Sequence, residues 1–125
     1  MHENDLSFFI RKAIFTVHNA LGPGLHPSVY IKALKQELEK LGVKVDPESM
    51  IFLDEQSAET GAGCRVDMLV SGKVIIEVKS VEEIRGYHCH QVLPYLHLSA
   101  VRPMILVNFN TDQIARSIHR FEVRR

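Results

Sequence analysis

The sequence is poor in residues that mark several protein classes. It has no tryptophan and only two cysteines, Cys64 and Cys89, among 125 residues. Two cysteines cannot form a disulfide framework, so we expect reduced thiols in a cytoplasmic protein. No apolar run approaches the roughly 18 residues that a membrane-spanning helix needs, so we expect no membrane span. The first residues, Met1–Asp5, lack a basic segment followed by an apolar one, and we expect no secretory signal.

An excess of charge of one sign is also missing. Fifteen Lys and Arg residues balance fifteen Asp and Glu residues, so any nucleic-acid binding must use a local patch. One basic patch ends the chain, although a solvated last strand is the simpler explanation for it: Arg116, His119, Arg120, Arg124 and Arg125. Hydrophobic residues make up 46% of the chain, an ordinary globular value. With no linker or repeat, this length predicts one domain over residues 1–125.

The apolar pattern predicts an α/β domain with the element order α-α-β-β-β-β-α-β-β. Apolar residues three and four apart predict helices over 5–21 and 27–41, joined by a turn at Gly22-Pro23-Gly24. A further helix is expected over 87–99. Apolar runs bounded by turn residues predict six strands, over 43–45, 50–53, 64–70, 73–79, 104–109 and 117–123. We expect these elements to form a central mixed sheet flanked by helices.

Polar residues interrupt one of the predicted strands in a regular way. Glu77 and Lys79 are two residues apart, so their side chains share one face of the strand. Val74, Ile76 and Val78 take the other face, which must be core. The sequence therefore predicts a charged face on an otherwise apolar strand.

The hairpin at Ser71-Gly72 decides whether Asp67 joins this charged face. A two-residue loop pairs Asp67 with Ile76 and points the carboxylate to the core. A three-residue loop, Val70–Gly72, pairs it with Ile75 and places it diagonally from Glu77. We expect the three-residue loop, or a β-bulge with the same effect, because a carboxylate is costly in an apolar core.

Two carboxylates on one face provide the oxygen ligands that Mg²⁺ and Mn²⁺ prefer. A lysine beside them can stabilise a pentavalent phosphate, so Asp67, Glu77 and Lys79 suit phosphodiester hydrolysis. Like charges brought together without metal should raise at least one pKa. On spacing alone, an exposed strand face with a Glu–Lys pair across neighbouring strands is the simpler explanation, because the pattern is short and common.

A set of ordered motifs makes the hydrolytic interpretation the stronger one. They are His18–Gly24, Tyr30, Gln36–Leu38, Arg65–Val70, Ile76–Val81, Gln91–Leu96 and Leu106–Phe109. In this order the motifs resemble the bacterial GxxExxY family of the PD-(D/E)XK nuclease superfamily, over nearly the whole chain. The resemblance implies a restriction-endonuclease-like core and metal-dependent cleavage of DNA phosphodiester bonds.

The resemblance also implies roles for individual residues. Asp67, Glu77 and the Val78 carbonyl are expected to bind Mg²⁺ or Mn²⁺, and Lys79 to stabilise the transition state. Gln91 is expected to orient the site or a phosphate, with Tyr95 beside it. Gln91, Tyr95 and Tyr30 are the expected substrate contacts, although a capping glutamine and core tyrosines are the simpler structural alternatives. A homodimer would lengthen the groove, but no motif indicates one.

The chain departs from the family pattern at one position. The pattern G-x-x-E-x-x-Y reads Gly24-Leu25-His26-Pro27-Ser28-Val29-Tyr30, with Pro27 in place of the glutamate. In many superfamily members a carboxylate on the first helices faces the metal site. Two functions follow as alternatives. One is a nuclease weakened by Pro27, and the other is a catalytically degenerate module that binds nucleic acid or protein.

The histidines near residue 90 do not predict a zinc site. His88, Cys89 and His90 are adjacent, so on a helix they point about 100° apart and do not converge. His97 adds no second cluster at zinc-finger spacing. His18, beside the apolar stripe of the first helix, is expected to be hydrogen-bonded and partly buried.

Overall fold

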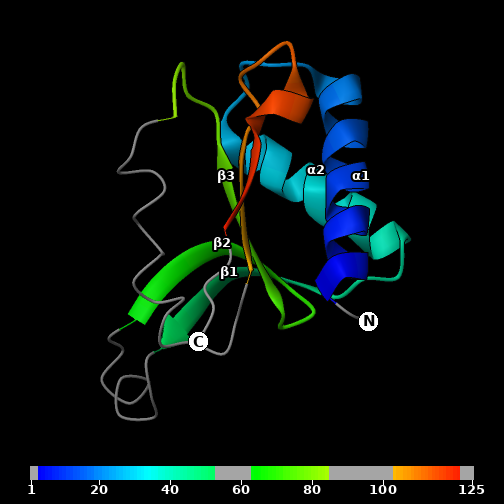
Figure 1. Ribbon diagram of the computed structural model, residues 1–125, viewed down its shortest axis with the longest axis vertical. Helices are drawn as coiled ribbons and strands as arrows, with labels where there is room; N and C mark the ends of the chain where they lie inside the picture. The colour runs from blue at the N-terminus through cyan, green and yellow to red at the C-terminus, as the bar shows by residue number, and fades with distance from the viewer. Residues whose placement is uncertain (1–2, 53–62, 85–102, 122–125) are drawn as a thin grey trace.

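The computed structural model describes residues 3–52, 63–84 and 103–121 of the chain (Figure 1). Two α-helices precede the first strand, and a short 3₁₀ helix precedes the last. In chain order the elements are α1 (Glu3–Leu21), α2 (Pro27–Lys40), β1 (Val45–Phe52), β2 (Gly63–Val70), β3 (Val74–Lys79), β4 (Met104–Asn108), η1 (Ile114–Ser117) and β5 (Ile118–Phe121).

The strands form one five-stranded sheet in the order β1-β2-β3-β4-β5. Only β3 and β4 run parallel, and the other neighbouring strands are antiparallel. Both described α-helices lie on one face of this sheet (Figure 1). The predicted α/β class with a central mixed sheet is therefore confirmed.

The hydrophobic core lies between the sheet and these two helices. Alternate residues of β3 (Val74, Ile76 and Val78) face it, as the sequence predicts, and all three are buried. The helices contribute stripes three and four residues apart, the spacing that places side chains on one helix face. The core residues of the helices are Leu6, Ile10, Ala13, Ile14, Val17, Tyr30, Leu34 and Leu38.

The turn between the helices is built as the glycines predict. Gly22 and Gly24 have φ values of 71° and 89°, which side chains with a Cβ rarely adopt. Pro27 is the first residue of α2, where its missing N–H has no helical partner in any case. His26 caps the helix, because its Nδ1 accepts a hydrogen bond from the Ser28 N–H at 3.1 Å.

The structure differs from the predicted elements in two details. The chain does not break at Asp46-Pro47, since β1 runs unbroken from Val45 to Phe52. Proline is tolerated there because β1 is an edge strand, whose outward N–H groups need no ladder partner. The 3₁₀ helix Ile114–Ser117 has no counterpart among the predicted elements. The helix expected over 87–99 lies outside the described residues.

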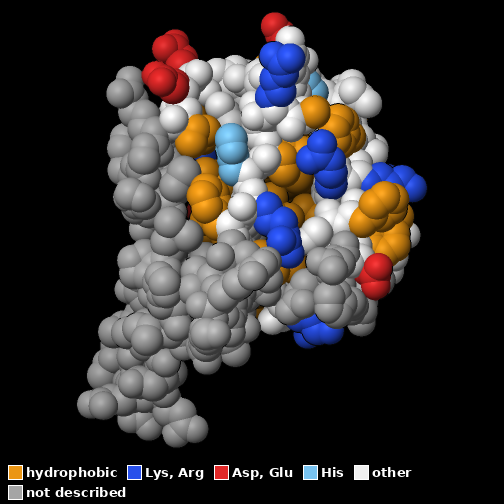
Figure 2. Space-filling view, viewed as in Figure 1, with side chains coloured by type: hydrophobic (Ala, Val, Ile, Leu, Met, Phe, Trp, Pro, Cys, Tyr) orange, Lys and Arg blue, Asp and Glu red, His pale blue; other side chains and the backbone are white. Residues whose placement is uncertain are grey.

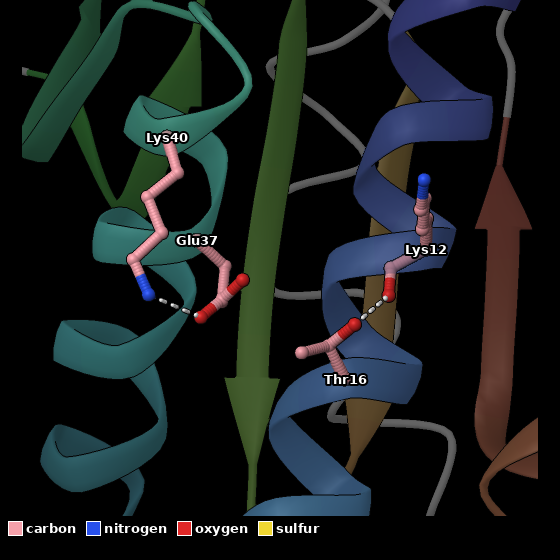
Figure 3. A network of polar contacts seen from close by, with 4 residues as sticks. All are labelled: Lys12, Thr16, Glu37 and Lys40. Carbon is pink, nitrogen blue, oxygen red and sulfur yellow. Dashed lines mark hydrogen bonds and ion pairs between the residues drawn. The ribbon is translucent and has the colours of Figure 1, made fainter.

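Polar contacts on the helices lie on their solvent side (Figure 3). Lys40 donates to Glu37 at 3.0 Å within α2, and Thr16 donates to the Lys12 carbonyl at 3.0 Å within α1. Exposed pairs of this kind add little to stability, so the helices are held mainly by their inward stripes. Among the described residues, no helix is both long and apolar enough to span a lipid bilayer.

Candidate active site

The β2–β3 hairpin places Asp67 and Glu77 on the same face of the sheet. Val70 pairs with Val74 and Met68 with Ile76, so the loop consists of Ser71, Gly72 and Lys73. The expected loop, Val70–Gly72, is therefore wrong by one position. The loop still has an odd number of residues, so the predicted shared face is confirmed. Continuing the register places Asp67 directly opposite Glu77 rather than diagonally.

The turn residues explain this register. Ser71 and Gly72 both have positive φ values, 52° and 66°. The Lys73 N–H donates to the Val70 carbonyl at 2.9 Å and closes the turn. Two consecutive residues at positive φ suit the twist of a hairpin. Glycine adopts a positive φ readily and serine rarely does, so Ser71 is the unusual residue of this turn.

The two carboxylates replace the backbone ladder where β2 and β3 part. The last paired residues are Met68 and Ile76, and beyond them β1 and β2 bend away from β3 together (Figure 1). There the Asp67 N–H donates to Glu77 Oε1 at 3.0 Å, and the Val78 N–H donates to Asp67 Oδ2 at 2.7 Å. Each strand thus supplies a carboxylate to a backbone N–H of the other. We call Asp67 and Glu77 the carboxylate pair.

Each carboxylate keeps one oxygen outside this exchange. Among the described residues, Asp67 Oδ1 has no hydrogen-bond partner. Glu77 Oε2 lies 3.8 Å from Lys79 Nζ, a loose ion pair rather than a hydrogen bond. The carboxylate pair therefore has two oxygens from adjacent strands available to a ligand.

Glu77 is an unusual residue to find buried. Its side chain is 3% exposed, and its pKa is raised from 4.5 to about 7, mainly by burial and further by the negative charge of Asp67. The Asp67 N–H bond and the Lys79 charge oppose this rise. The predicted rise of a pKa is confirmed, but its largest cause is burial and not repulsion between like charges.

Lys79 stands at the end of β3 and is one-fifth exposed. Its carbonyl accepts a hydrogen bond from the Phe109 N–H at 2.9 Å. Its backbone is thus fixed to the chain just after β4, while its ammonium group lies 3.8 Å from Glu77 Oε2. An ammonium group placed beside two carboxylates can contact an anionic group bound there.

The direction of the Val78 backbone follows from the ladder of β3. Ile75 N–H donates to the Pro103 carbonyl at 3.0 Å, and Lys79 accepts from Phe109. Alternate residues of a strand bond to the same neighbour, so Ile75, Glu77 and Lys79 bond toward β4. The Val78 N–H and carbonyl then face β2, on the side where Asp67 lies. The Val78 carbonyl is therefore a third oxygen directed toward the carboxylate pair.

Tyr30 lies in the core and not on a substrate surface. Its side chain is fully buried, and its ring stacks on Phe109 with centroids 4.2 Å apart. The hydroxyl donates to the Gly22 carbonyl at 2.6 Å and accepts from the Leu25 N–H at 3.1 Å. Both hydroxyl partners are backbone groups of the turn between the helices. Tyr30 thus has no surface to offer a substrate in this conformation.

Pro27 lies at the same end of the sheet as the carboxyl ends of β3 and β4. Gly24, in the turn that leads into α2, lies next to Asn110, just past β4, since a Cβ added to Gly24 would be 4.0 Å from Asn110 Oδ1. The family position of the missing glutamate is therefore near the end of the sheet where Lys79 lies. The proline itself offers no ligand.

Asn108 is a polar residue that sequence reasoning missed. It is 5% exposed, at the end of a strand whose other residues are buried and mostly apolar. Its side chain donates to the Val81 carbonyl at 2.9 Å and accepts from the Val81 N–H at 3.0 Å. A single asparagine inside an apolar run is a usable signal, because buried amides need partners.

The remaining predicted residues divide into two groups. Gln91 and Tyr95 lie outside the described residues, as do His88, Cys89, His90 and His97. His18 is partly buried as expected, with its Nε2 2.6 Å from the Thr111 carbonyl. Of the terminal basic patch, Arg116 and Arg120 are exposed. On the face shown in Figure 2, the described Lys and Arg side chains lie apart from one another.

The chemistry of these donors fits a hard divalent cation. Carboxylate and carbonyl oxygens are the ligands that Mg²⁺ and Mn²⁺ prefer. Within residues 3–52, 63–84 and 103–121, no group of three or more His, Cys, Asp or Glu side chains could hold a metal ion. In this part of the chain, the carboxylate pair thus lies in no larger group of acidic, histidine or cysteine side chains.

Comparison with known proteins gives one match. A family model described as the PD-(D/E)XK nuclease superfamily matches residues 4–121. No curated protein and no solved structure matches the chain significantly. The family match spans almost the whole chain, and it agrees with the mixed sheet and its helices.

Proposed function

The chain belongs to the PD-(D/E)XK nuclease superfamily, and we propose that it is a divalent-metal-dependent nuclease that cleaves DNA phosphodiester bonds. The observation that carries the proposal is the exchange of hydrogen bonds between the carboxylate pair and the opposing backbones, with Lys79 3.8 Å from Glu77. This arrangement holds two carboxylates and an ammonium group at the opening between β2 and β3. The restriction-endonuclease-like fold of the family is consistent with it.

Each residue has a defined role in the proposal. Asp67 Oδ1, Glu77 Oε2 and the Val78 carbonyl would hold Mg²⁺ or Mn²⁺, which when bound would polarise the phosphate and lower the pKa of water. The Lys79 ammonium would stabilise the negative charge that builds up on the phosphate oxygens in the transition state. The two backbone bonds keep both carboxylates in place, so little reorganisation is needed when substrate binds.

Further parts of the proposal rest on the sequence. We assign the chain to the GxxExxY family from its motifs and expect it to act in the cytoplasm of a bacterium. Gln91 and Tyr95 are proposed to contact the substrate. Tyr30 is left out of the substrate contacts, because its hydroxyl already has two partners. Assembly as a homodimer stays a prediction without a described contact to support it.

Pro27 favours a second candidate function. It stands where the family pattern has glutamate, so the metal site would have only two carboxylates. A site weakened in this way suits a catalytically degenerate module that binds nucleic acid or protein on the same fold. The two candidates differ in one property: only the nuclease needs metal for its effect on DNA.

The test is a cleavage assay preceded by a metal titration. Calorimetry with Mg²⁺ and Mn²⁺ is followed by incubation with labelled single- and double-stranded DNA, with and without EDTA. Asp67→Asn is the informative variant, because the amide oxygen can still accept from the Val78 N–H while the charge is lost. Glu37→Gln, which changes a partly exposed carboxylate on α2, is the control.

The nuclease proposal expects metal-dependent cleavage by the wild type and by Glu37→Gln, and none by Asp67→Asn. Cleavage that persists in EDTA, or that Asp67→Asn retains in full, would contradict it. DNA binding that is indifferent to EDTA, without cleavage in any metal, would identify the binding module instead.

A further inference from the structure

The side chain of Asn108 links the end of β4 to the segment that follows β3. Its amide takes both backbone groups of Val81, donating to the carbonyl at 2.9 Å and accepting from the N–H at 3.0 Å. The same Oδ1 also accepts from the Asn110 N–H at 3.2 Å. One buried side chain thereby supplies the pair of hydrogen bonds that a neighbouring strand would give to the segment after β3.

The hydrogen bonds between Asn108 and Val81 lie next to Lys79 in the fold. Asn108 is the β4 partner of Lys79 in the parallel register, and paired residues place their side chains on the same face. The next residue, Phe109, donates its N–H to the Lys79 carbonyl at 2.9 Å. The chain from Lys79 to Val81 is therefore held at three backbone groups, all by Asn108 and Phe109.

Core stability alone gives little reason for an amide at this position. Asn108 is 5% exposed, and its strand neighbours are buried apolar residues. An apolar side chain would avoid the cost of burying an amide, whose net contribution after hydrogen bonding is small. What the amide adds is a fixed path for the chain beyond Lys79, where a strand end would otherwise fray.

We infer that Asn108 is a positioning residue, which holds the Lys79–Val81 segment so that the Lys79 ammonium stays aimed at the carboxylate pair. The inference rests on the proposed function for the role of Lys79. It does not require Asn108 to touch metal or substrate. Asn108 should therefore affect the chemical step and leave metal binding unchanged.

The test compares three variants. Asn108→Ala removes all three hydrogen bonds. Asn108→Asp keeps an acceptor for the two N–H groups and loses only the bond to the Val81 carbonyl. Asn110→Ala is the matched control, because Asn110 bonds to Asn108 Oδ1 through its backbone N–H and not through its side chain.

Three readouts separate positioning from a general loss of structure. Amide hydrogen exchange measures the protection of the Val81 N–H, and the NMR order parameter measures the mobility of the Lys79 backbone. Steady-state kinetics give kcat and KM, and calorimetry gives the Mn²⁺ Kd. For Asn108→Ala we expect faster exchange at Val81, a lower order parameter at Lys79 and a kcat lower by on the order of 10- to 100-fold. KM and the Mn²⁺ Kd should stay unchanged, Asn108→Asp should be intermediate, and Asn110→Ala should match the wild type.

A double-mutant cycle with Lys79→Ala completes the test. If Asn108 acts through Lys79, Asn108→Ala lowers kcat no further once Lys79 is gone. An equal loss in both backgrounds, or a loss of Mn²⁺ affinity that matches the loss of activity, would overturn the inference. If the wild type cleaves no DNA, the proposed function fails on its own. The Lys79 order parameter then decides the positioning claim: unchanged order in Asn108→Ala would overturn it.

Discussion

Tyr30 and the carboxylate pair each join separate elements of the protein, and the two differ in charge. Tyr30 reaches the turn between α1 and α2 through one hydroxyl, whose donor and acceptor capacities are both used by backbone groups. The carboxylate pair also bonds to backbone groups, those of β2 and β3. Unlike the tyrosine, it retains negative charge and two further oxygens at a largely buried position.

The difference indicates what each cluster is for. A neutral, fully satisfied hydroxyl stabilises the fold and has no capacity left for a ligand. A buried carboxylate pair carries a desolvation cost that a bound cation would relieve, and the raised pKa of Glu77 is the sign of that cost. Changes to the first cluster should therefore alter stability, whereas changes to the second should alter activity and pH dependence.

The largest expected effect comes from removing the cation of the charged cluster. Lys79→Ala should lower the rate of DNA cleavage by about 10²- to 10³-fold, the usual loss when one transition-state contact is removed. The melting temperature should change little, because the ion pair with Glu77 is long at 3.8 Å. Lys35→Ala, which breaks an exposed pair on α2, is the control. Equal losses in both variants would show that Lys79 has no special role.

Glu77 should make the stability of the metal-free protein depend on pH. Its pKa is about 7 in the folded state against 4.5 as the ordinary value, so the folded protein holds its proton more tightly. The contribution of Glu77 to stability is then greatest below pH 4.5, falls as the pH rises to about 7 and is constant above. At 1.36 kcal/mol per pH unit, this shift corresponds to about 3 kcal/mol.

Urea unfolding between pH 4 and 8 checks this prediction. Glu77→Gln should flatten the profile, leave stability at pH 8 equal or higher, and abolish stabilisation by Mg²⁺. Glu37→Gln, which changes a partly exposed carboxylate paired with Lys40, should leave the profile as in the wild type. A wild-type protein that gains stability from pH 5 to 7 through Glu77 would contradict the burial argument.

Tyr30→Phe should have the opposite pattern. Removing the hydroxyl leaves the Gly22 carbonyl and the Leu25 N–H without their partner, at a cost of about 1–3 kcal/mol. Metal affinity should not change, because the hydroxyl lies in the turn and not at the carboxylate pair. Thr16→Val is the control, since its hydroxyl bond to Lys12 is exposed (Figure 3) and should contribute less than ~0.5 kcal/mol. Weaker Mn²⁺ binding by Tyr30→Phe would break the distinction between the two clusters.

The sequence predicts the two clusters unequally. Parity along β3 and the cost of a buried carboxylate suffice to put Asp67, Glu77 and Lys79 on one face. The direct opposition of Asp67 and Glu77 was not predictable, because it depends on Ser71 adopting a positive φ of 52°. The role of Tyr30 was also not predictable, since only the folded chain shows that Gly22 and Leu25 use both sides of its hydroxyl.

The place of a residue in the folded chain likewise decides features that the local sequence pattern cannot predict. The strand break expected at Pro47 is absent because β1 is an edge strand, which is a property of the sheet and not of the dipeptide. The pKa of Glu77 rises mainly through burial, whereas the sequence shows only that another carboxylate is near. Asn108 looked like an ordinary strand residue until its partner, Val81, was found 27 positions away.

The smallest expected effect on stability concerns Pro27, and it asks whether the charged cluster is incomplete. Pro27→Glu loses the restriction that proline places on the unfolded chain, a few tenths to about 1 kcal/mol. A glutamate in the first turn is favoured by the helix dipole, and α2 has no acidic residue there. The fold should therefore tolerate the change.

A third carboxylate at the end of the sheet where β3 and β4 finish should strengthen the attraction for a cation. We expect Pro27→Glu to bind Mn²⁺ more tightly by up to about tenfold, equivalent to ~1.4 kcal/mol, and to cleave DNA faster than the wild type. Val29→Glu is the matched control, because it adds the same charge to the same turn at an exposed position, about 200° around the helix. If both variants bind Mn²⁺ equally, the gain reflects net charge alone. If neither binds better than the wild type, residue 27 does not face the carboxylate pair, and the departure from the family pattern cannot explain the activity of this protein.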